Sequence, residues 1–176
     1  MEKIILIDEE DNEIGSGEKI DVHKKGKLHR AFSIFVFNSK GEMIIQQRDI
    51  RKYHCGGLWT NTCCSHPRHG EIIEEAVHRR LKEEMGFDCG LREMFKFTYK
   101  AEFSSGLTEY ETDHVFVGIS DDEPTLNKEE AMDYRWISIK ELANEIENNP
   151  ERYTPWFKIA LQKLVESEKI ECKVRK

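Results

Sequence analysis

The segment from Glu71 to Met85 constrains the fold most, because it predicts an amphipathic helix in the middle of a chain that is otherwise rich in strand patterns. Its apolar residues recur one or two helical turns apart, and Gly86 is a typical stop signal. These apolar residues are Ile72, Ala76, Leu81 and Met85. One helix in mid-chain with strands before and after it favours an α+β protein.

The strands are predicted from runs of apolar residues and from alternation. Two runs flank the turn Asn38-Ser39-Lys40-Gly41 as a hairpin, from Ala31 to Phe37 and from Met43 to Arg48. The segment from Phe95 to Phe103 alternates with a period of two, which is typical of a half-buried strand. Further strands are expected at Ile4 to Asp8, Glu109 to Ile119 and Asp133 to Ile137.

Two more helices are predicted near the end of the chain. Ser138 and Glu141 form a capping box for a short helix, and Thr154-Pro155 opens a longer one. The polar segment from 120 to 130 is expected to be a surface loop. We therefore predict an α+β sandwich of mixed β-sheet between helices, with all 176 residues in a single domain.

The charge balance limits the partners. Lys and Arg number 27 against 34 Asp and Glu, a net charge of −7, so the mean field repels nucleic acids and anionic membranes. An anionic substrate must therefore meet a local basic cluster. No apolar run of about 18 residues is present and the start is no signal peptide, so we expect a cytoplasmic protein. Five cysteines, an odd number, indicate free thiols rather than a disulfide framework.

The helix also has an acidic pattern: Glu71, seven residues, then Arg79-Arg80-Leu81-Lys82-Glu83-Glu84-Met85-Gly86-Phe87. An acidic helix alone is more often a solvated face, but this full spacing resembles the Nudix box, which gathers carboxylates around a cation bound to diphosphate. Two positions differ from Nudix hydrolases. Those enzymes have Gly where this chain has Ser65, and Glu where this chain has Arg80. The second change removes a metal-binding acid and puts Arg80 and Glu84 on one helix face, suited to a phosphate oxygen and a cation.

The segment before the helix narrows the resemblance. It reads Trp59-Thr60-Asn61-Thr62-Cys63-Cys64-Ser65-His66-Pro67 and resembles the W-T-N-x-x-C-x-H-P signature of the type I isopentenyl diphosphate isomerases, a Nudix-like family. Other matching pieces span nearly the whole chain: His23, Leu28 to Ser33, Glu109-Tyr110-Glu111, Met132 to Trp136 and Tyr153 to Trp156. The resemblance implies a Nudix-like sandwich for the predicted fold.

The resemblance implies a metal site with mixed nitrogen and oxygen ligands: His23, His29, His66, Glu109 and Glu111. Three imidazoles and two carboxylates suit Mn²⁺ or Zn²⁺ better than Mg²⁺. The alternative for any single histidine is an ordinary surface residue. The other four histidines are interpreted as non-ligands: His54, His69, His78 and His114.

The resemblance also implies the catalytic residues. Isomerisation adds a proton to one alkene carbon and removes another further along, so it needs two proton carriers on opposite faces of the substrate. Cys64 and Glu111 resemble this pair, and on an extended segment Cys64 points with His66 while Cys63 points away. Tyr99 is expected to assist Glu111, and Trp156 to face the carbocation. The alternatives are a small buried hydrophobe for Cys64 and core packing for the two aromatics.

The diphosphate requires cations in an acidic chain. The family's basic positions correspond to Lys19, Arg48, Lys52 and Arg80, with Arg51 as a possible substitute. A second cation, Mg²⁺, is expected to bridge the phosphate oxygens to Glu84.

The expected function is thus an enzyme that interconverts isopentenyl and dimethylallyl diphosphate in isoprenoid biosynthesis. Its partner is a small diphosphate, with no nucleic acid and no membrane, and the sequence has no signal for an oligomeric state. One alternative is a Nudix diphosphate hydrolase, which needs neither Cys64 nor three histidines. The other is an inactive Nudix-like binding module, against which intact metal ligands and Cys64 argue.

Overall fold

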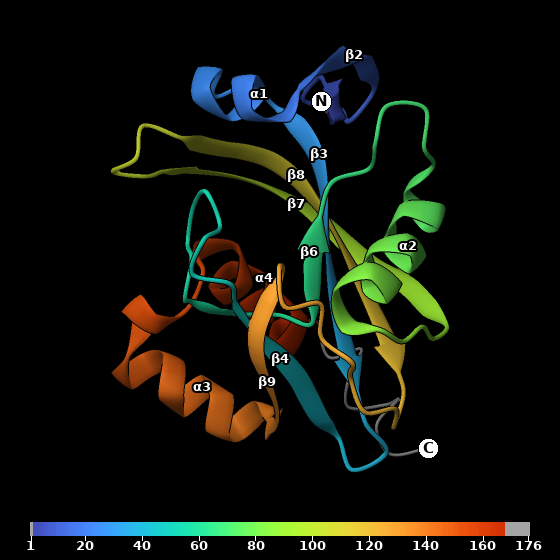
Figure 1. The fold of residues 1–176 in the computed structure, drawn as a ribbon, viewed down its shortest axis with the longest axis vertical. Coiled ribbons are helices and arrows are strands. Elements are labelled where there is room, and N and C mark those ends of the chain that lie inside the picture. The colour runs from blue at the N-terminus through green and yellow to red at the C-terminus, as the bar shows by residue number, and fades with distance from the viewer. Residues whose placement is uncertain (1, 168–176) are drawn as a thin grey trace.

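The computed structural model describes residues 2–167, which form a nine-stranded mixed sheet with helices on both sides (Figure 1). The strands are β1 Lys3–Ile7, β2 Glu13–Glu18, β3 His29–Phe37, β4 Glu42–Arg48, β5 Trp59–Thr60, β6 Cys63–Ser65, β7 Leu91–Glu102, β8 Thr108–Ile119 and β9 Ala131–Ser138. The helices are α1 Lys19–Lys25, α2 Ile73–Met85, α3 Ile139–Asn148, the 3₁₀ turn η1 Pro150–Arg152 and α4 Pro155–Glu166. The predicted α+β sandwich is confirmed.

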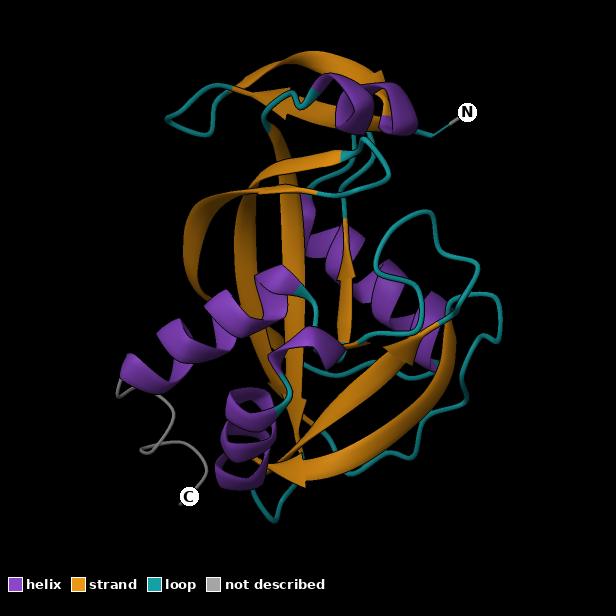
Figure 2. Cartoon of the chain, turned by 90° about the vertical axis from the view of Figure 1, so that its left-hand side faces the viewer, coloured by secondary structure: helices purple, strands orange, loops and turns teal. Residues whose placement is uncertain are grey.

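Strand β3 is the centre of this arrangement. It pairs in parallel with β8, from His29 opposite Glu111 to Phe37 opposite Ile119. The short strand β6 pairs antiparallel with β3 as well, with Ser33 opposite Cys64. Strands β7 and β8 form a long antiparallel pair whose turn projects to the left in Figure 1. Figure 2 shows the strands with helices on either side of them. A residue of β3 therefore has neighbours from two distant parts of the chain.

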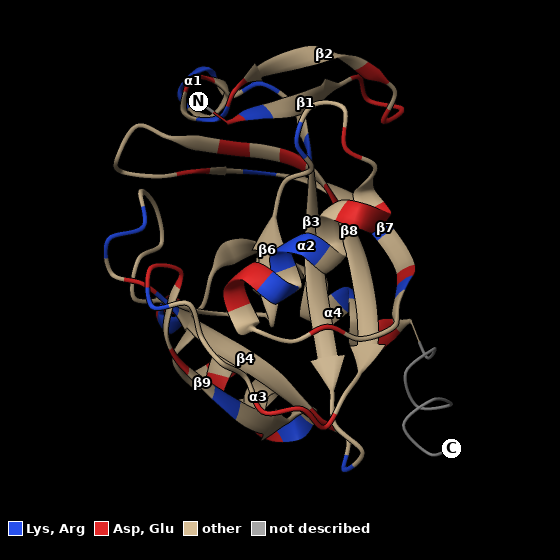
Figure 3. Cartoon of the chain, turned by 45° about the vertical axis from the view of Figure 1, so that its right-hand side comes forward, with Lys and Arg blue, Asp and Glu red and all other residues tan. Residues whose placement is uncertain are grey.

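The two faces of β3 and β8 pack against different helices. Odd-numbered residues such as Phe35 and Val115 join a hydrophobic cluster with α3 and α4, and we call this side the α4 face. Even-numbered residues such as Ile34 and Phe116 join a second cluster with α2, and we call this side the α2 face. Figure 3 shows α2 in front of these strands, with α4 behind them. The alternation of side chains along a strand produces both clusters.

Most predicted elements are present, and the structure adds short ones that were not predicted, among them β5, β6 and η1. Helix α2 begins at Ile73 rather than Glu71, because Ile72 is the extended N-cap residue; its side chain is 58% exposed and does not belong to the apolar face. The polar stretch after Asn12 contains β2 and α1, which the sequence patterns did not indicate. Two glycines weaken the strand signal of β2, and α1 has only seven residues, which is too short for a clear periodicity.

The predicted helix signals are present in the structure. Ser138 and Glu141 form the capping box of α3, and Pro155 is the first residue of α4. Gly86 ends α2 in the left-handed conformation, with φ of 76°, where a β-carbon would also lie 2.5 Å from the carbonyl oxygen of Thr125. No helix within residues 2–167 combines the length and the apolar character that crossing a membrane requires. The four cysteines in that range are unpaired thiols, and Cys172 lies outside it.

Candidate active site

One pocket gathers most of the predicted site residues, and we call it the site pocket. Its walls come from the start of α1, from β3, β6, β8 and α2, from the end of β4, from the first turn of α4 and from the loop 49–58 between β4 and β5. The predicted residues that line it are Lys19, Arg48, Lys52, Cys64, His66, Arg80, Glu84, Glu109, Glu111 and Trp156. The other three, His23, His29 and Tyr99, are buried in contact with Glu111.

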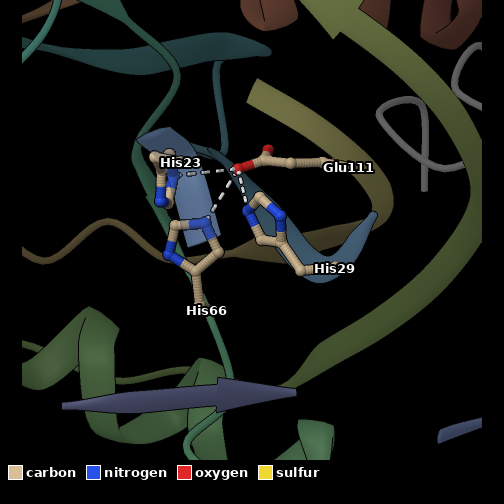
Figure 4. A group of neighbouring side chains, drawn as sticks. All are labelled: His23, His29, His66 and Glu111. Atoms are coloured by element: carbon tan, nitrogen blue, oxygen red, sulfur yellow. Dashed lines mark hydrogen bonds and ion pairs between the residues drawn. The ribbon is translucent and has the colours of Figure 1, made fainter. Parts of the chain in front are cut away.

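Three histidines converge on one carboxylate oxygen (Figure 4). Glu111 Oε1 on β8 lies 2.8 Å from His66 Nε2, 3.0 Å from His29 Nε2 and 3.8 Å from His23 Nε2. These four residues, which we call the histidine cluster, are buried, and their ligand atoms lie within 4.8 Å of one another. Parallel pairing of β3 with β8 brings His29 and Glu111 together, because they are directly opposite in register.

In two of the imidazole rings, the hydrogen bond made by Nδ1 determines whether Nε2 carries a proton or a lone pair. His23 Nδ1 donates to the carbonyl oxygen of Lys19 at 2.6 Å, and His29 Nδ1 donates to that of Lys27 at 2.8 Å, because a carbonyl group can only accept. In neutral rings the two Nε2 atoms therefore present lone pairs to Glu111, whose oxygens are acceptors as well. Lone pairs that face one another are stabilised by a cation among them, and ring nitrogens oriented in this way are typical metal ligands. The residues present fit a divalent metal.

Burial favours the neutral form of two of these imidazoles, His23 and His66. It lowers the pKa of His23 from 6.5 to about 4 and lowers the pKa of His66 well below its usual range. Burial, with the charge of Glu111 beside it, raises the pKa of Glu109. Neutral imidazoles beside a carboxylate are the state in which metals bind.

Tyr99 on β7 lies between the two glutamates. Its hydroxyl oxygen is 2.8 Å from Glu109 Oε2 and 2.7 Å from Glu111 Oε2. A hydroxyl has one hydrogen, so it cannot donate to two ionised carboxylates at once. A proton or a metal cation on one glutamate satisfies this contact, which agrees with the raised pKa of Glu109.

The two adjacent cysteines of β6 point to opposite sides. Cys63 is fully buried in the α2-side cluster, whereas Cys64 lines the site pocket, as the alternation of a strand requires. Burial raises the pKa of the Cys64 thiol to about 12, although the guanidinium of Arg48, whose Nη1 is 3.7 Å from Sγ, opposes this change. The thiol therefore retains its proton at neutral pH.

Trp156 lies in the first turn of α4 and is 3% exposed. The cation that its ring contacts in the structure is the guanidinium of Arg48, 5.3 Å from the ring centroid. Arg48 thus contacts both Cys64 and Trp156, and it links the thiol to the aromatic wall of the pocket.

Helix α2 presents the predicted phosphate-binding pair. Arg80 Nη2 donates to Glu84 Oε1 at 2.5 Å and to Glu130 Oε1 at 3.0 Å, and Lys52 forms an ion pair with Glu130 as well. Gln46 donates to the other oxygen of Glu84 at 2.8 Å. Sequence reasoning did not find Glu130, because it lies in the polar loop before β9 and no periodicity relates it to α2. In the structure Lys52 and Arg80 neutralise this carboxylate.

The remaining cations occupy different surroundings. Lys19 lines the site pocket and forms an ion pair with Glu2 at 3.3 Å. Arg51, the possible substitute, does not line the site pocket; it pairs with Asp49 at 2.8 Å. The structure thus brings Lys19, but not Arg51, to the pocket.

The histidines interpreted as non-ligands divide into two kinds. His69, His78 and His114 lie outside the site pocket and pair with Glu13, Asp88, and both Asp11 and Glu93 respectively. His54 lines the pocket, with Nε2 2.8 Å from Glu109 Oε1, so the structure places it beside the predicted ligands. It lies in an irregular loop, so no spacing in the sequence connects it with the other histidines.

The fold and a sequence profile define the class of the protein. The NUDIX domain profile matches residues 27–157. A protein of Deinococcus radiodurans, DR0079, has the same fold with a TM-score of 0.77 at 20% identity, over 92% of this chain and 98% of that one. A MutT protein of Methanosarcina mazei has a TM-score of 0.66 at 18% identity, over 81% of this chain and 96% of that one.

Closer relatives narrow the class. The chain is 54% identical to the isopentenyl-diphosphate Delta-isomerase 2 of Photorhabdus laumondii, over 89% of both chains. It is 48% identical to the isopentenyl-diphosphate Delta-isomerase of Serratia proteamaculans, over 95% of this chain and 93% of the relative. The chain therefore belongs to the isopentenyl-diphosphate Delta-isomerase family of Nudix proteins.

Proposed function

We propose that this chain interconverts isopentenyl diphosphate and dimethylallyl diphosphate, a step of isoprenoid biosynthesis. The observation that supports this most is the meeting of a protonated thiol, Cys64, and a buried carboxylate, Glu111, in one pocket beside a cluster of histidines. A relative that is 54% identical is named for this reaction. Nudix hydrolases have an acid at the position of Arg80, so the arginine in this chain also favours isomerisation over hydrolysis.

The reaction moves a double bond through a tertiary carbocation. An alkene is a very weak base, so it needs an acid on one face and a base on the other, and water must be excluded while the cation exists. Cys64 on β6 and Glu111 on β8 lie on strands that both pair with β3, and both residues line the site pocket. We assign the two proton transfers to this pair, one on each face of the alkene.

Two neighbours prepare these groups. The Tyr99 hydroxyl, 2.7 Å from Glu111, orients the carboxylate and stabilises its charge. Arg48 orients the Cys64 thiol and reduces the cost of removing its proton. The ring of Trp156 excludes water from the pocket and stabilises the carbocation, which is worth about 2 kcal/mol for a desolvated cation–π contact.

The metal would be held by His23, His29, His66, Glu109 and Glu111, and we propose Mn²⁺ or Zn²⁺ because imidazole nitrogen predominates. When bound, it supplies positive charge that sets the protonation of the glutamates.

The diphosphate would lie along the basic side of the pocket. Lys19, Arg48, Lys52 and Arg80 all line it and supply charge-assisted hydrogen bonds to the phosphate oxygens. Glu84 would hold a Mg²⁺ ion that shares those oxygens. Arg80 and Lys52 then exchange part of their contact with Glu130 for contacts with phosphate. We further propose that the whole chain is one cytoplasmic domain that acts on this small molecule alone.

Incubation of the metal-loaded protein with isopentenyl diphosphate in D₂O tests the proposal. Deuterium should appear in dimethylallyl diphosphate, followed by NMR, without release of inorganic phosphate. Phosphate release at a rate that matches isomerisation would favour the Nudix hydrolase. Binding of the diphosphate without either product would favour the inactive binding module.

A further inference from the structure

The loop 49–58 puts one more imidazole beside the histidine cluster. His54 is 7% exposed, and its ring is stacked on that of Phe103, with 5.2 Å between centroids and 2° between planes. The rings of Tyr53 and Trp156 meet it edge to face, with centroids at 4.3 and 5.7 Å. Three aromatic neighbours therefore determine where the ring nitrogens of His54 point.

One of these nitrogens lies against a glutamate that the proposed metal site already contains. His54 Nε2 is 2.8 Å from Glu109 Oε1, yet neither ring nitrogen has a hydrogen-bond partner in the described part of the chain, so this short contact lacks hydrogen-bond alignment. Two atoms bound at right angles to one ion, each through a bond of about 2.1 Å, lie about 3.0 Å apart. The contact thus has the spacing of two ligands of the same ion.

His23 connects His54 with the histidine cluster. The ligand atoms of His23, His54 and Glu109 lie within 4.8 Å of one another, as do those of the four residues of the histidine cluster. The Nδ1 atom of His23 donates to the carbonyl of Lys19, so only its Nε2 atom is available to both groups. One lone pair binds one ion, so His23 can serve both groups only if they share a single centre.

We infer that His54 is a direct ligand of the metal, the sixth protein residue in its coordination. This inference rests on the proposed function in that it requires the metal centre. Six donors exceed the four that Zn²⁺ takes in structural sites and match the octahedral coordination of Mn²⁺. The inference therefore also favours Mn²⁺ over Zn²⁺.

The assignment has a consequence for the substrate. His54 and Lys52 lie two residues apart in the same loop, and both line the site pocket. A bond from His54 to the metal holds this loop against the pocket. Metal binding then positions Lys52 for the diphosphate, so the two halves of the site are connected through the loop 49–58.

Substitution of the metal with Co²⁺ tests the inference, because its visible spectrum reports the coordination number. The full chain is compared with its His54→Ala variant, and with His69→Ala as a control, because His69 is exposed and pairs with Glu13 outside the site pocket. We expect His54→Ala to absorb more strongly in the visible range and to lose Co²⁺ to a chelator at least about tenfold faster, by analogy with the loss of supporting groups. An unchanged spectrum and release rate would overturn the inference.

A second measurement needs no variant. Each histidine bound to Co²⁺ gives one exchangeable N–H resonance that is strongly shifted in the proton NMR spectrum. Four such resonances in the wild-type protein support His54 as a ligand, and three overturn it even if His54→Ala does not fold. Neither measurement uses isomerase activity. A wild-type protein that binds no Co²⁺ would overturn the metal centre itself, whereas a loaded protein with three resonances would overturn only His54.

Discussion

Histidine and acidic side chains meet on both faces of β3 and β8. On one face the charges are paired within the protein, and on the other they are not. On the α2 face His114 lies between Asp11 at 2.9 Å and Glu93 at 2.7 Å. Arg30 and Lys96 also pair with Asp11, at 2.8 and 2.9 Å. We call these five residues the outer ion network.

On the α4 face three histidines approach one carboxylate oxygen, and the Nε2 lone pairs of His23 and His29 face this acceptor. The outer ion network is neutralised by the protein itself, with two acids, two bases and one imidazole. The histidine cluster needs a cation from outside. A metal site is therefore recognised by lone pairs that the protein leaves unmatched rather than by the number of histidines and acids.

The largest contrast is expected between the two sides of β6. Cys64→Ala should lower isomerisation by about 10⁴-fold or more, because general acid–base groups contribute up to that amount and an alkene is a demanding base. Cys63→Ala should retain most activity, because this thiol is buried in the opposite cluster. Initial rates per folded, metal-loaded protein check this. Comparable rates for Cys64→Ala and wild type would remove the thiol from the mechanism.

The second prediction compares the metal content of variants on the two faces. His66→Ala should bind far less divalent metal than wild type, because it removes a ligand whose Nε2 is 2.8 Å from Glu111. His114→Ala should bind the same amount, although it removes a histidine with two acidic neighbours. Elemental analysis after dialysis measures both. Equal metal in wild type and His66→Ala would refute the site.

The metal-free protein should lose stability in acid. The pKa of His23 is lowered from 6.5 to about 4 in the fold, so between these values the unfolded chain binds more protons than the folded one. Stability is then complete above about pH 6.5 and falls as the pH decreases towards 4, by on the order of 3 kcal/mol. Urea titrations across this range measure the slope, which His23→Asn should reduce. An unchanged slope in that variant would contradict the assignment.

The smallest expected effect concerns two cations of α2. Arg80→Ala should weaken binding of the diphosphate by about 1.5 to 3 kcal/mol, the value of a charge-assisted hydrogen bond. Lys82→Ala is the control, because Lys82 is exposed and pairs with Asp88 away from the site pocket. Calorimetric titration with the diphosphate compares them. Equal affinities for wild type and Arg80→Ala would exclude Arg80 from binding.

The sequence predicts what depends on local periodicity or on a spaced motif. The alternation from Phe95 to Phe103 and the spacing of α2 were sufficient to place β7 and the helix. The motif around Cys64 and His66 was sufficient to nominate residues that the fold brings to one pocket. The short strand β2 and helix α1 were missed, because glycines and shortness remove their periodic signal.

The partners of the site residues are the part that no local pattern contains. Glu130 and His54 lie in irregular loops, and they approach Arg80 and Glu109 only because the chain folds back on itself. The proton position on His23 depends in turn on the carbonyl of Lys19, which becomes its neighbour when α1 forms. These facts follow from three-dimensional contacts, and sequence reasoning supplies only the residues that take part.

The parallel pairing of β3 with β8 has a consequence for how the protein is made. His29 and Glu111 are 82 residues apart in the chain, and no shorter segment contains both. Contacts this distant in sequence form slowly, because a long loop must close before they provide any stabilisation. During synthesis the first two imidazoles must therefore wait until the ribosome has released β8. We expect metal uptake to accompany one of the last folding steps, so that the ion is bound only by chains whose topology is complete.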